Sequence, residues 1–224
     1  MIPDDDLNIW LQTRDSLYPL YARRAIGGET EMDCQAQAAE IYAPYFSPGD
    51  RILDAAGGSG YFYWSLKKRA LLGDYHLLDY NRDFLDMGRE ALSEELDSSK
   101  FIHASIQELS GEYEAVFCLN ALFCLPDYRQ GLERLLKAAV KIIIIRTTLA
   151  ESRLIRYETD KFLDKTARGL KSYFNIWPLA EMADFMHSHG FSVESPVDRR
   201  TGDKPEISAG KEFPWRWLVG IKTV

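Results

Sequence analysis

The chain has 224 residues, of which 46% are hydrophobic, and its 34 acidic side chains outnumber the 27 basic ones to give a formal net charge of −7. This length and composition can fill one sizeable core, so we expect a single domain with additions. The acidic balance, with no basic run longer than Lys67-Lys68-Arg69, disfavours nucleic acid as a general partner.

The cysteines and apolar runs point to a compartment. No two of Cys34, Cys118 and Cys124 have Cys-x-x-Cys spacing, and Asp4-Asp5-Asp6 stands where a secretory signal would be basic. An odd number of cysteines in this context favours the reducing cytoplasm. The strongest apolar run, Ile142 to Ile145, is too short to cross a bilayer, so we expect no membrane partner. The four histidines show no metal-ligand spacing, and we predict no metal site.

The first predicted elements are two helices. A helical pattern runs over about 7–24, where Trp10, Tyr18 and Tyr21 share one side, and a second runs over 31–46. Ser47-Pro48-Gly49-Asp50 ends the second helix. We assign residues 1–47 to an N-terminal helical extension that forms a lid.

From residue 48 onward, short apolar strands alternate with helical patterns. This alternation is typical of an α/β domain with a parallel sheet and right-handed crossovers. Strands are predicted near 51–54, 75–79, 101–103, 115–119 and 141–146, and helices near 61–70, 82–96 and 128–139.

The alternation breaks after Arg146. The charged, aromatic-containing stretch of about 147–177 fits no simple crossover, and we predict a functional insertion there. The pattern resumes with a helix near 178–189 and strands near 191–194 and 215–222. The connection between these strands is too short for a crossover helix, so we expect them to pair antiparallel. Residues 48–224 would form one domain that contains the insertion.

The most specific pattern is the run from Arg51 to Gly60, in which a short apolar strand feeds directly into a glycine-rich turn and a helix. Glycines let backbone N–H groups close on a bound group, and the helix N-terminus adds unpaired donors. Asp54 ends the strand, where its carboxylate can order the turn's N–H groups or reach a ligand's ammonium group. Helix capping is its ordinary alternative.

A second acidic residue stands in register with this turn. Asp79 ends the next strand, 19 positions after Gly60. In a doubly wound sheet this position lies beside the first glycine turn, where a carboxylate accepts hydrogen bonds from a ribose. Nicotinamide dinucleotides call for Gly-x-Gly-x-x-Gly, but Tyr63 replaces the third glycine. A turn without it suits a ligand that lacks a pyrophosphate, such as S-adenosylmethionine.

Over about residues 48–146 the chain resembles the class I S-adenosylmethionine-dependent methyltransferases. Their first motif, hydrophobic-Leu-Asp-x-Gly-x-Gly-x-Gly, is nearly matched from Ile52 to Gly60, with Ala56 at the usual place of the first glycine. The turn survives this change if Ala56 keeps φ below zero, and we expect it to be intact. The runs at 78–89, 101–109 and 113–127 resemble the second, third and fourth motifs in order.

The resemblance implies a doubly wound, mostly parallel seven-stranded sheet with an antiparallel C-terminal strand. It also implies that Tyr80 lies along the adenine, with Ile106 as the opposite apolar face and Ser105 as a polar contact where the family often has an aspartate. Asn120, just past the fourth strand, either directs its amide toward the ligands or simply favours a turn. The expected cofactor residues are Asp54, Ala56, Gly57, Gly58, Gly60, Asp79, Tyr80, Ser105, Ile106 and Asn120.

The acceptor site is expected outside these motifs, in the lid, the insertion and the basic end of the fifth strand. Core packing explains the aromatic members equally well. The expected acceptor residues are Trp10, Tyr18, Tyr21, Arg146, Tyr173, Asn175 and Trp177.

We therefore predict methyl transfer from S-adenosyl-L-methionine to a small-molecule acceptor, by an in-line displacement that depends mainly on positioning. No general base is evident, because Phe123 or Cys124 replaces the histidine that often follows the family's fourth strand; Tyr61, Tyr63 and Tyr173 are candidates. A cofactor-binding module without turnover is the alternative, and an NAD-dependent oxidoreductase is less favoured. Oxygen, nitrogen and carbon acceptors all stay open.

Overall fold

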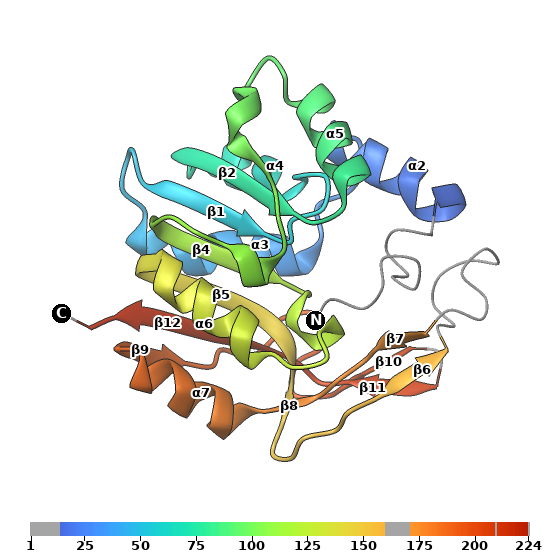
Figure 1. Ribbon diagram of the computed structural model, residues 1–224, viewed down its shortest axis with the longest axis vertical. Coiled ribbons are helices and arrows are strands. Elements are labelled where there is room, and N and C mark those ends of the chain that lie inside the picture. The colour runs from blue at the N-terminus through green and yellow to red at the C-terminus, as the bar shows by residue number, and fades with distance from the viewer. Residues whose placement is uncertain (1–13, 160–170, 209, 224) are drawn as a thin grey trace.

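The computed structural model describes residues 14–159, 171–208 and 210–223, so the predicted lid residue Trp10 lies outside the described part of the chain (Figure 1). The helices are α2 (Arg14–Ala25), α3 (Asp33–Tyr42), α4 (Phe62–Lys68), α5 (Arg82–Ala91), α6 (Arg129–Ala138) and α7 (Leu179–Ser188). Short 3₁₀ turns are η2 (Ala43–Tyr45), η3 (Ser98–Lys100), η4 (Ile106–Glu108) and η5 (Leu122–Cys124).

Seven strands form the main sheet in the order β3-β2-β1-β4-β5-β12-β9. β12 is antiparallel to both of its neighbours, and the ladders from β3 through β5 are parallel. These findings confirm the predicted sheet and its reversed strand. The strands are β1 (Arg51–Ala55), β2 (Asp74–Asp79), β3 (Phe101–His103), β4 (Tyr113–Leu119), β5 (Ala139–Ala150), β9 (Phe191–Glu194) and β12 (Trp215–Lys222).

Helices cover both faces of this sheet (Figure 1). One apolar cluster joins α6 and α7, through residues such as Leu132 and Met182, to one face. A second joins α3 and α4, through residues such as Ala38 and Phe62, to the other. Alternate side chains of the same buried strands enter different clusters, Ile143 the first and Ile144 the second, as the two-residue period of a strand requires.

The structure extends β5 to Ala150, four residues beyond the predicted end. Thr147 and Thr148 stay in the sheet because they pair with Arg216 and Trp215 of β12, and both threonines are fully buried. The rest of the predicted insertion contains the antiparallel pair β6 (Tyr157–Thr159) and β7 (Lys171–Tyr173), followed by the two-residue β8 (Trp177–Pro178) beside β5. A second short pair, β10 (Glu206–Ser208) and β11 (Lys211–Phe213), precedes β12.

The short strand pairs and α2 lie toward the same edge of the molecule as the carboxyl ends of β1 and β2 (Figure 1). Ligands of open α/β sheets bind at this edge. None of the described helices has the length and hydropathy that a transmembrane segment needs.

Candidate functional site

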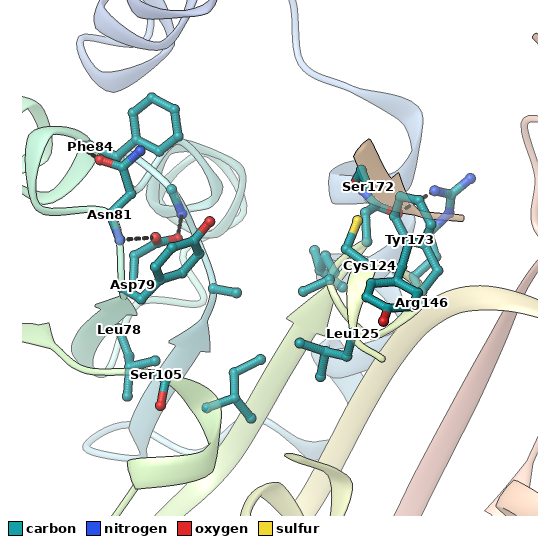
Figure 2. A pocket seen from close by; sticks show the side chains of 18 of the residues that line it. Leu78, Asp79, Asn81, Phe84, Ser105, Cys124, Leu125, Arg146, Ser172 and Tyr173 are labelled. Carbon is teal, nitrogen blue, oxygen red and sulfur yellow. Dashed lines mark hydrogen bonds between the residues drawn. The ribbon is translucent and has the colours of Figure 1, made fainter. Parts of the chain in front are cut away.

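A cavity of about 920 Å³ opens at the carboxyl edge of the sheet. Figure 2 shows two groups of lining side chains facing each other across it, with Asp79, Asn81 and Ser105 on one side and Cys124, Arg146 and Tyr173 on the other. We name the first the turn side. We name the second the hairpin side, which comprises Phe123, Cys124, Arg146, Tyr157, Lys171, Ser172, Tyr173, Arg200 and Trp215.

The glycine turn forms, but Ala56 does not keep the negative φ that we expected. Its φ is 57°, in the left-handed region that a glycine adopts without strain, so the usual glycine at this place has a backbone reason. A left-handed non-glycine residue costs about 1 kcal/mol or more. Backbone hydrogen bonds from Gly57 N to Leu78 O (3.2 Å) and from Gly60 N to Gly57 O (3.1 Å) hold the turn despite this strain.

Asp54 lies underneath the turn and does not line the cavity. Its carboxylate is 2% exposed and accepts a 2.7 Å hydrogen bond from the Tyr75 hydroxyl. A Cβ on Gly57 would come within 2.3 Å of Asp54 Oδ2, so this position has room only for glycine. Burial raises the pKa of Asp54 to about 7, and the neighbouring Asp79 adds to the rise.

Asp79 lines the cavity at the carboxyl end of β2. Its Oδ2 accepts from Gly58 N and its Oδ1 from Asn81 N, each at 2.8 Å, which fixes the carboxylate between the glycine turn and the start of α5 (Figure 2). Burial raises the pKa of Asp79 to about 6, although the backbone hydrogen bonds favour the ionised form. Asp79 thus accepts from the backbone of Gly58, Asn81 and Tyr80, and because a carboxylate has about four acceptor sites it keeps acceptor capacity toward a ligand.

The N-terminal helix covers the glycine turn. The Tyr21 ring stacks on Phe84 at 4.2 Å, and a Cβ on Gly58 would lie 2.7 Å from Tyr21 Cε1, so the ring rests on the turn. Ser59 Oγ donates to the Tyr21 carbonyl (2.8 Å), and Trp64 Nε1 donates to the Ala25 carbonyl (2.7 Å). α2 is therefore fixed to the turn and to α4 through both side chains and backbone.

The region expected to hold adenine contains a charged acceptor that the motif comparison missed. Ser105 Oγ and Ser105 N both donate to Glu108 Oε2, at 2.8 and 3.0 Å, as a capping box of η4. These hydrogen bonds lower the pKa of Glu108, with the Ser105 N–H contributing most. Ser105, Glu108 and Ile106 all line the cavity, so a carboxylate lies three residues after the position where the family often has one.

A buried polar chain links the end of β4 to Arg146 within β5. Arg146, 2% exposed, donates from Nε to Asp198 Oδ2 and from Nη1 to Asn120 Oδ1, both at 2.5 Å. Asn120 has φ 62° and its Nδ2 faces Cys34 Sγ at 3.9 Å. Asp198 is fully buried and also accepts from Thr201. Burial alone would raise the pKa of Asp198, but the Arg146 ion pair and the Thr201 hydrogen bonds together lower it. The guanidinium lies 4.3 Å over the Trp215 ring.

The structure gathers most, but not all, of the expected residues around the cavity. Asp54, Gly57 and Gly60 shape the turn from outside its lining. Tyr18 hydrogen-bonds Asp83 outside the cavity, and Trp177 and Asn175 are fully buried, with side-chain hydrogen bonds to the backbone at Leu122 and Leu125. The expected residues that line the cavity are Ala56, Gly58, Asp79, Tyr80, Ser105, Ile106, Asn120, Tyr21, Arg146 and Tyr173.

Arg24 is another lining residue that sequence reasoning did not single out. Its guanidinium lies over the rings of Tyr21 (5.5 Å) and Tyr61 (5.1 Å), and among the described residues it has no carboxylate partner. Its place one helical turn after Tyr21 is the only signal that the sequence offered.

Groups able to accept a proton are few. Tyr61 and Tyr173 line the cavity, whereas Tyr63 is buried and donates to Glu95. Burial raises the pKa of Tyr61 well above its ordinary value, which disfavours the phenolate. Within residues 14–159, 171–208 and 210–223, no three His, Cys, Asp or Glu side chains gather as metal ligands would.

Neither a family model nor a curated protein matches this sequence. Solved structures do match in fold. Magnesium protoporphyrin IX methyltransferase from Synechocystis PCC 6803, with bound S-adenosylmethionine, is 16% identical with a TM-score of 0.63 over 100% of both chains. CcbJ methyltransferase from Streptomyces caelestis is 14% identical with a TM-score of 0.60, over 98% of this chain and 100% of its own.

A third structure contains both a methyl acceptor and the demethylated cofactor. It is the 1,6-didemethyltoxoflavin-N1-methyltransferase of Burkholderia thailandensis, 16% identical with a TM-score of 0.57 over 85% of this chain and 78% of its own. With the sheet order β3-β2-β1-β4-β5-β12-β9 and these likenesses, the chain has the fold of the class I S-adenosylmethionine-dependent methyltransferases.

Proposed function

We propose that the protein transfers a methyl group from S-adenosyl-L-methionine to a small molecule. The observation that carries this proposal is Asp79, a buried carboxylate that lines the cavity beside the glycine turn and is held there by backbone N–H groups, among them those of Gly58 and Asn81. Neighbours of the same fold bind S-adenosylmethionine or its product, and one of them is solved with a small-molecule acceptor. A small-molecule acceptor and, given three free cysteines, a reducing cytoplasmic setting belong to the proposal.

The cavity residues fit this cofactor by their chemistry. Asp79 would accept hydrogen bonds from the ribose, and Glu108 from the adenine amino group. Tyr80 and Ile106 would flank the adenine ring. Arg24 would pair with the carboxylate of the amino-acid end, near Gly58.

The cofactor supplies a methyl group already activated on a positively charged sulfur, so the chain's task is alignment and the exclusion of water. Tyr21 on α2 closes the site above the glycine turn. The Arg146–Asn120 hydrogen bond turns the amide so that Nδ2 faces away from Arg146, toward Cys34 Sγ at 3.9 Å, which leaves its second N–H for a ligand. Because burial raises the pKa values of Tyr21 and Tyr61, an acceptor that is already ionised, or a neutral nucleophile that loses its proton afterwards, fits best.

Thermal unfolding with two ligands, S-adenosylhomocysteine and NAD, tests the proposal. S-adenosylhomocysteine at about a hundred times its dissociation constant adds roughly 2.7 kcal/mol of stability, so the midpoint should rise by about 5–10 °C. NAD should give no shift. Asp79→Ala should remove the response to S-adenosylhomocysteine, while Lys204→Gln, an exposed residue outside the cavity, should retain it. A rise with NAD alone would contradict the proposal.

A binding module that has lost turnover is the second candidate. The strained Ala56 and the Tyr21 ring on Gly58 favour it, because both occupy the turn against which the cofactor's amino-acid end would lie. Incubation with methyl-labelled S-adenosylmethionine and a broad acceptor panel separates the two. Label transferred to any acceptor supports the enzyme, and binding without transfer across the panel supports the module.

A further inference from the structure

We propose that the hairpin side of the cavity binds a planar aromatic molecule through one carboxylate. This inference rests on the function proposed above and names the class of acceptor. It is carried by three observations on this side: the distribution of charge, an unused guanidinium donor and the aromatic walls.

Charge is divided unevenly between the two sides of the cavity. The acidic lining residues are Glu31, Asp33, Asp79, Glu108 and Asp127, and none of them belongs to the hairpin side as defined above. The hairpin side contributes three basic residues, Arg146, Lys171 and Arg200, and no acidic one. A negatively charged group is therefore favoured on the hairpin side and disfavoured near the opposite wall.

The balance of charge fits a single negative group. Behind the lining, Asp198 neutralises Arg146 at 2.5 Å, and Glu206 neutralises Arg200 at 2.5 Å. Lys171 remains, with its ammonium 5.7 Å from the centre of the Tyr157 ring and with no carboxylate in ion-pair distance among the described residues. One uncompensated cation matches a carboxylate better than it matches a doubly charged phosphate.

Arg146 has donors that the chain does not use. Nε and Nη1 have acceptors, but Nη2 has no hydrogen-bond partner among the described residues and is shielded from solvent. Buried polar groups normally find a partner, and an unpaired guanidinium donor in a ligand cavity is a common site of carboxylate recognition. Trp215 covers one face of this guanidinium, so the bound oxygen would approach along its edge.

The walls around these cations are aromatic. Phe123 and Trp215 meet edge to face at 5.2 Å, and Tyr157 and Tyr173 lie 4.6 Å apart. Glu206 Oε2 accepts from Trp215 Nε1 at 2.8 Å, which fixes the indole as a wall. Rigid rings on both flanks favour a flat, apolar body over a flexible or sugar-like one. A ring with a single carboxylate satisfies the walls and the cations together.

The test compares matched ligands on the protein saturated with S-adenosylhomocysteine. The probes are 2-naphthoate, indole-3-carboxylate and quinoline-2-carboxylate, each beside its carboxamide, with 2-naphthyl phosphate as a further arm. Dissociation constants come from ligand-observed NMR titration. We expect at least one acid to bind about tenfold more tightly than its amide, and the naphthyl phosphate to bind no better than the naphthoate.

Variants assign this preference to the hairpin side. Lys171→Gln should reduce the acid-over-amide ratio at least about threefold, because it removes an exposed cation without disturbing the core. Arg146→Gln combined with Asp198→Asn removes both members of the buried pair and should bring the ratio close to one. Lys204→Gln is the matched control outside the cavity and should keep the wild-type ratio.

A separate titration with S-adenosylhomocysteine distinguishes failure of this inference from failure of the proposed function. If that ligand binds and no acid is preferred over its amide, this inference is wrong and the proposed function stands. If phosphate binds more tightly, the carboxylate assignment is wrong. If S-adenosylhomocysteine does not bind the wild-type protein, the proposed function and this inference fall together.

Discussion

Ligand binding at the turn side should depend on the ionisation state of Asp79. Its pKa is about 6 in the folded protein because it is buried, and only the ionised form accepts hydrogen bonds through both oxygens. Affinity for a ribose-containing ligand should therefore be weak below this pKa and rise as the pH passes through it. We expect the dissociation constant of S-adenosylhomocysteine to fall about tenfold between pH 5.0 and pH 7.5.

Isothermal titration at the two pH values measures this change. Asp79→Asn should bind weakly at both, because an amide cannot ionise. Lys204→Gln serves as the control, since Lys204 is exposed outside the cavity and its removal should leave the step near pH 6 in place. Equal affinity of the wild-type protein for S-adenosylhomocysteine at pH 5.0 and 7.5 would show that ionised Asp79 does not contribute to binding.

Ala56 stores strain that a glycine would release. Because its φ is 57°, Ala56→Gly should raise the free energy of unfolding by up to about 1 kcal/mol, less the greater entropy of glycine in the unfolded chain. Ala55→Gly, one residue earlier in the extended β1, should instead destabilise by about 0.5–1 kcal/mol. Urea denaturation of the wild type, Ala56→Gly and Ala55→Gly measures these changes in the free energy of unfolding. If Ala56→Gly were less stable than the wild type, the turn would not be strained.

At the scale of elements, α5 packs closely against the glycine turn because Gly88, at the contact, has no side chain. A Cβ on Gly88 would lie 2.9 Å from the backbone oxygen of Ser59, which cannot move without moving the turn. Gly88→Ala should thus lower the free energy of unfolding by about 1–3 kcal/mol and weaken S-adenosylhomocysteine binding, although alanine is the better helix former.

Gly131→Ala in α6 is the control for this helix substitution. Its Cβ would meet only side-chain carbon atoms, at 3.2 Å and beyond, so helix propensity should dominate and stability should stay equal or rise. Denaturant midpoints and calorimetric titrations of both variants give the comparison. If Gly88→Ala matched Gly131→Ala in stability and left binding unchanged, the close contact of α5 with the turn would have no energetic weight.

Elements with a strong period could be predicted from the sequence. The isoleucine run of β5 and the end of β2 at Asp79 lie where the pattern indicated, and β1 ends at Ala55, one residue beyond its predicted end. The end of β5 could not, because the polar Thr147 and Thr148 resemble a loop in sequence and stay in the strand only because β12 pairs with them. Strands as short as β6 and β7 have too few residues to show a two-residue alternation, so the sequence predicted only an insertion there and no strands.

At the scale of the whole molecule, the sequence predicted the turn side of the site far better than the hairpin side. The turn side is local, since Gly58 and Asp79 stand in adjacent β–turn–α units. The hairpin side depends on distant pairs, such as Arg146 with Asp198, 52 positions apart. Sequence patterns also could not separate a cavity aromatic such as Tyr173 from a core aromatic such as Trp177, since both suit either environment.

The seating of α2 on the glycine turn affects how quickly the site can exchange its contents. Any molecule that touches the peptide at Gly58 must first displace the Tyr21 ring, and that ring is attached to a helix anchored at both Ser59 and Trp64. Entry and departure at this end would then depend on how often α2 moves away from the turn, and product release would limit catalytic turnover if that movement were slower than the chemical step.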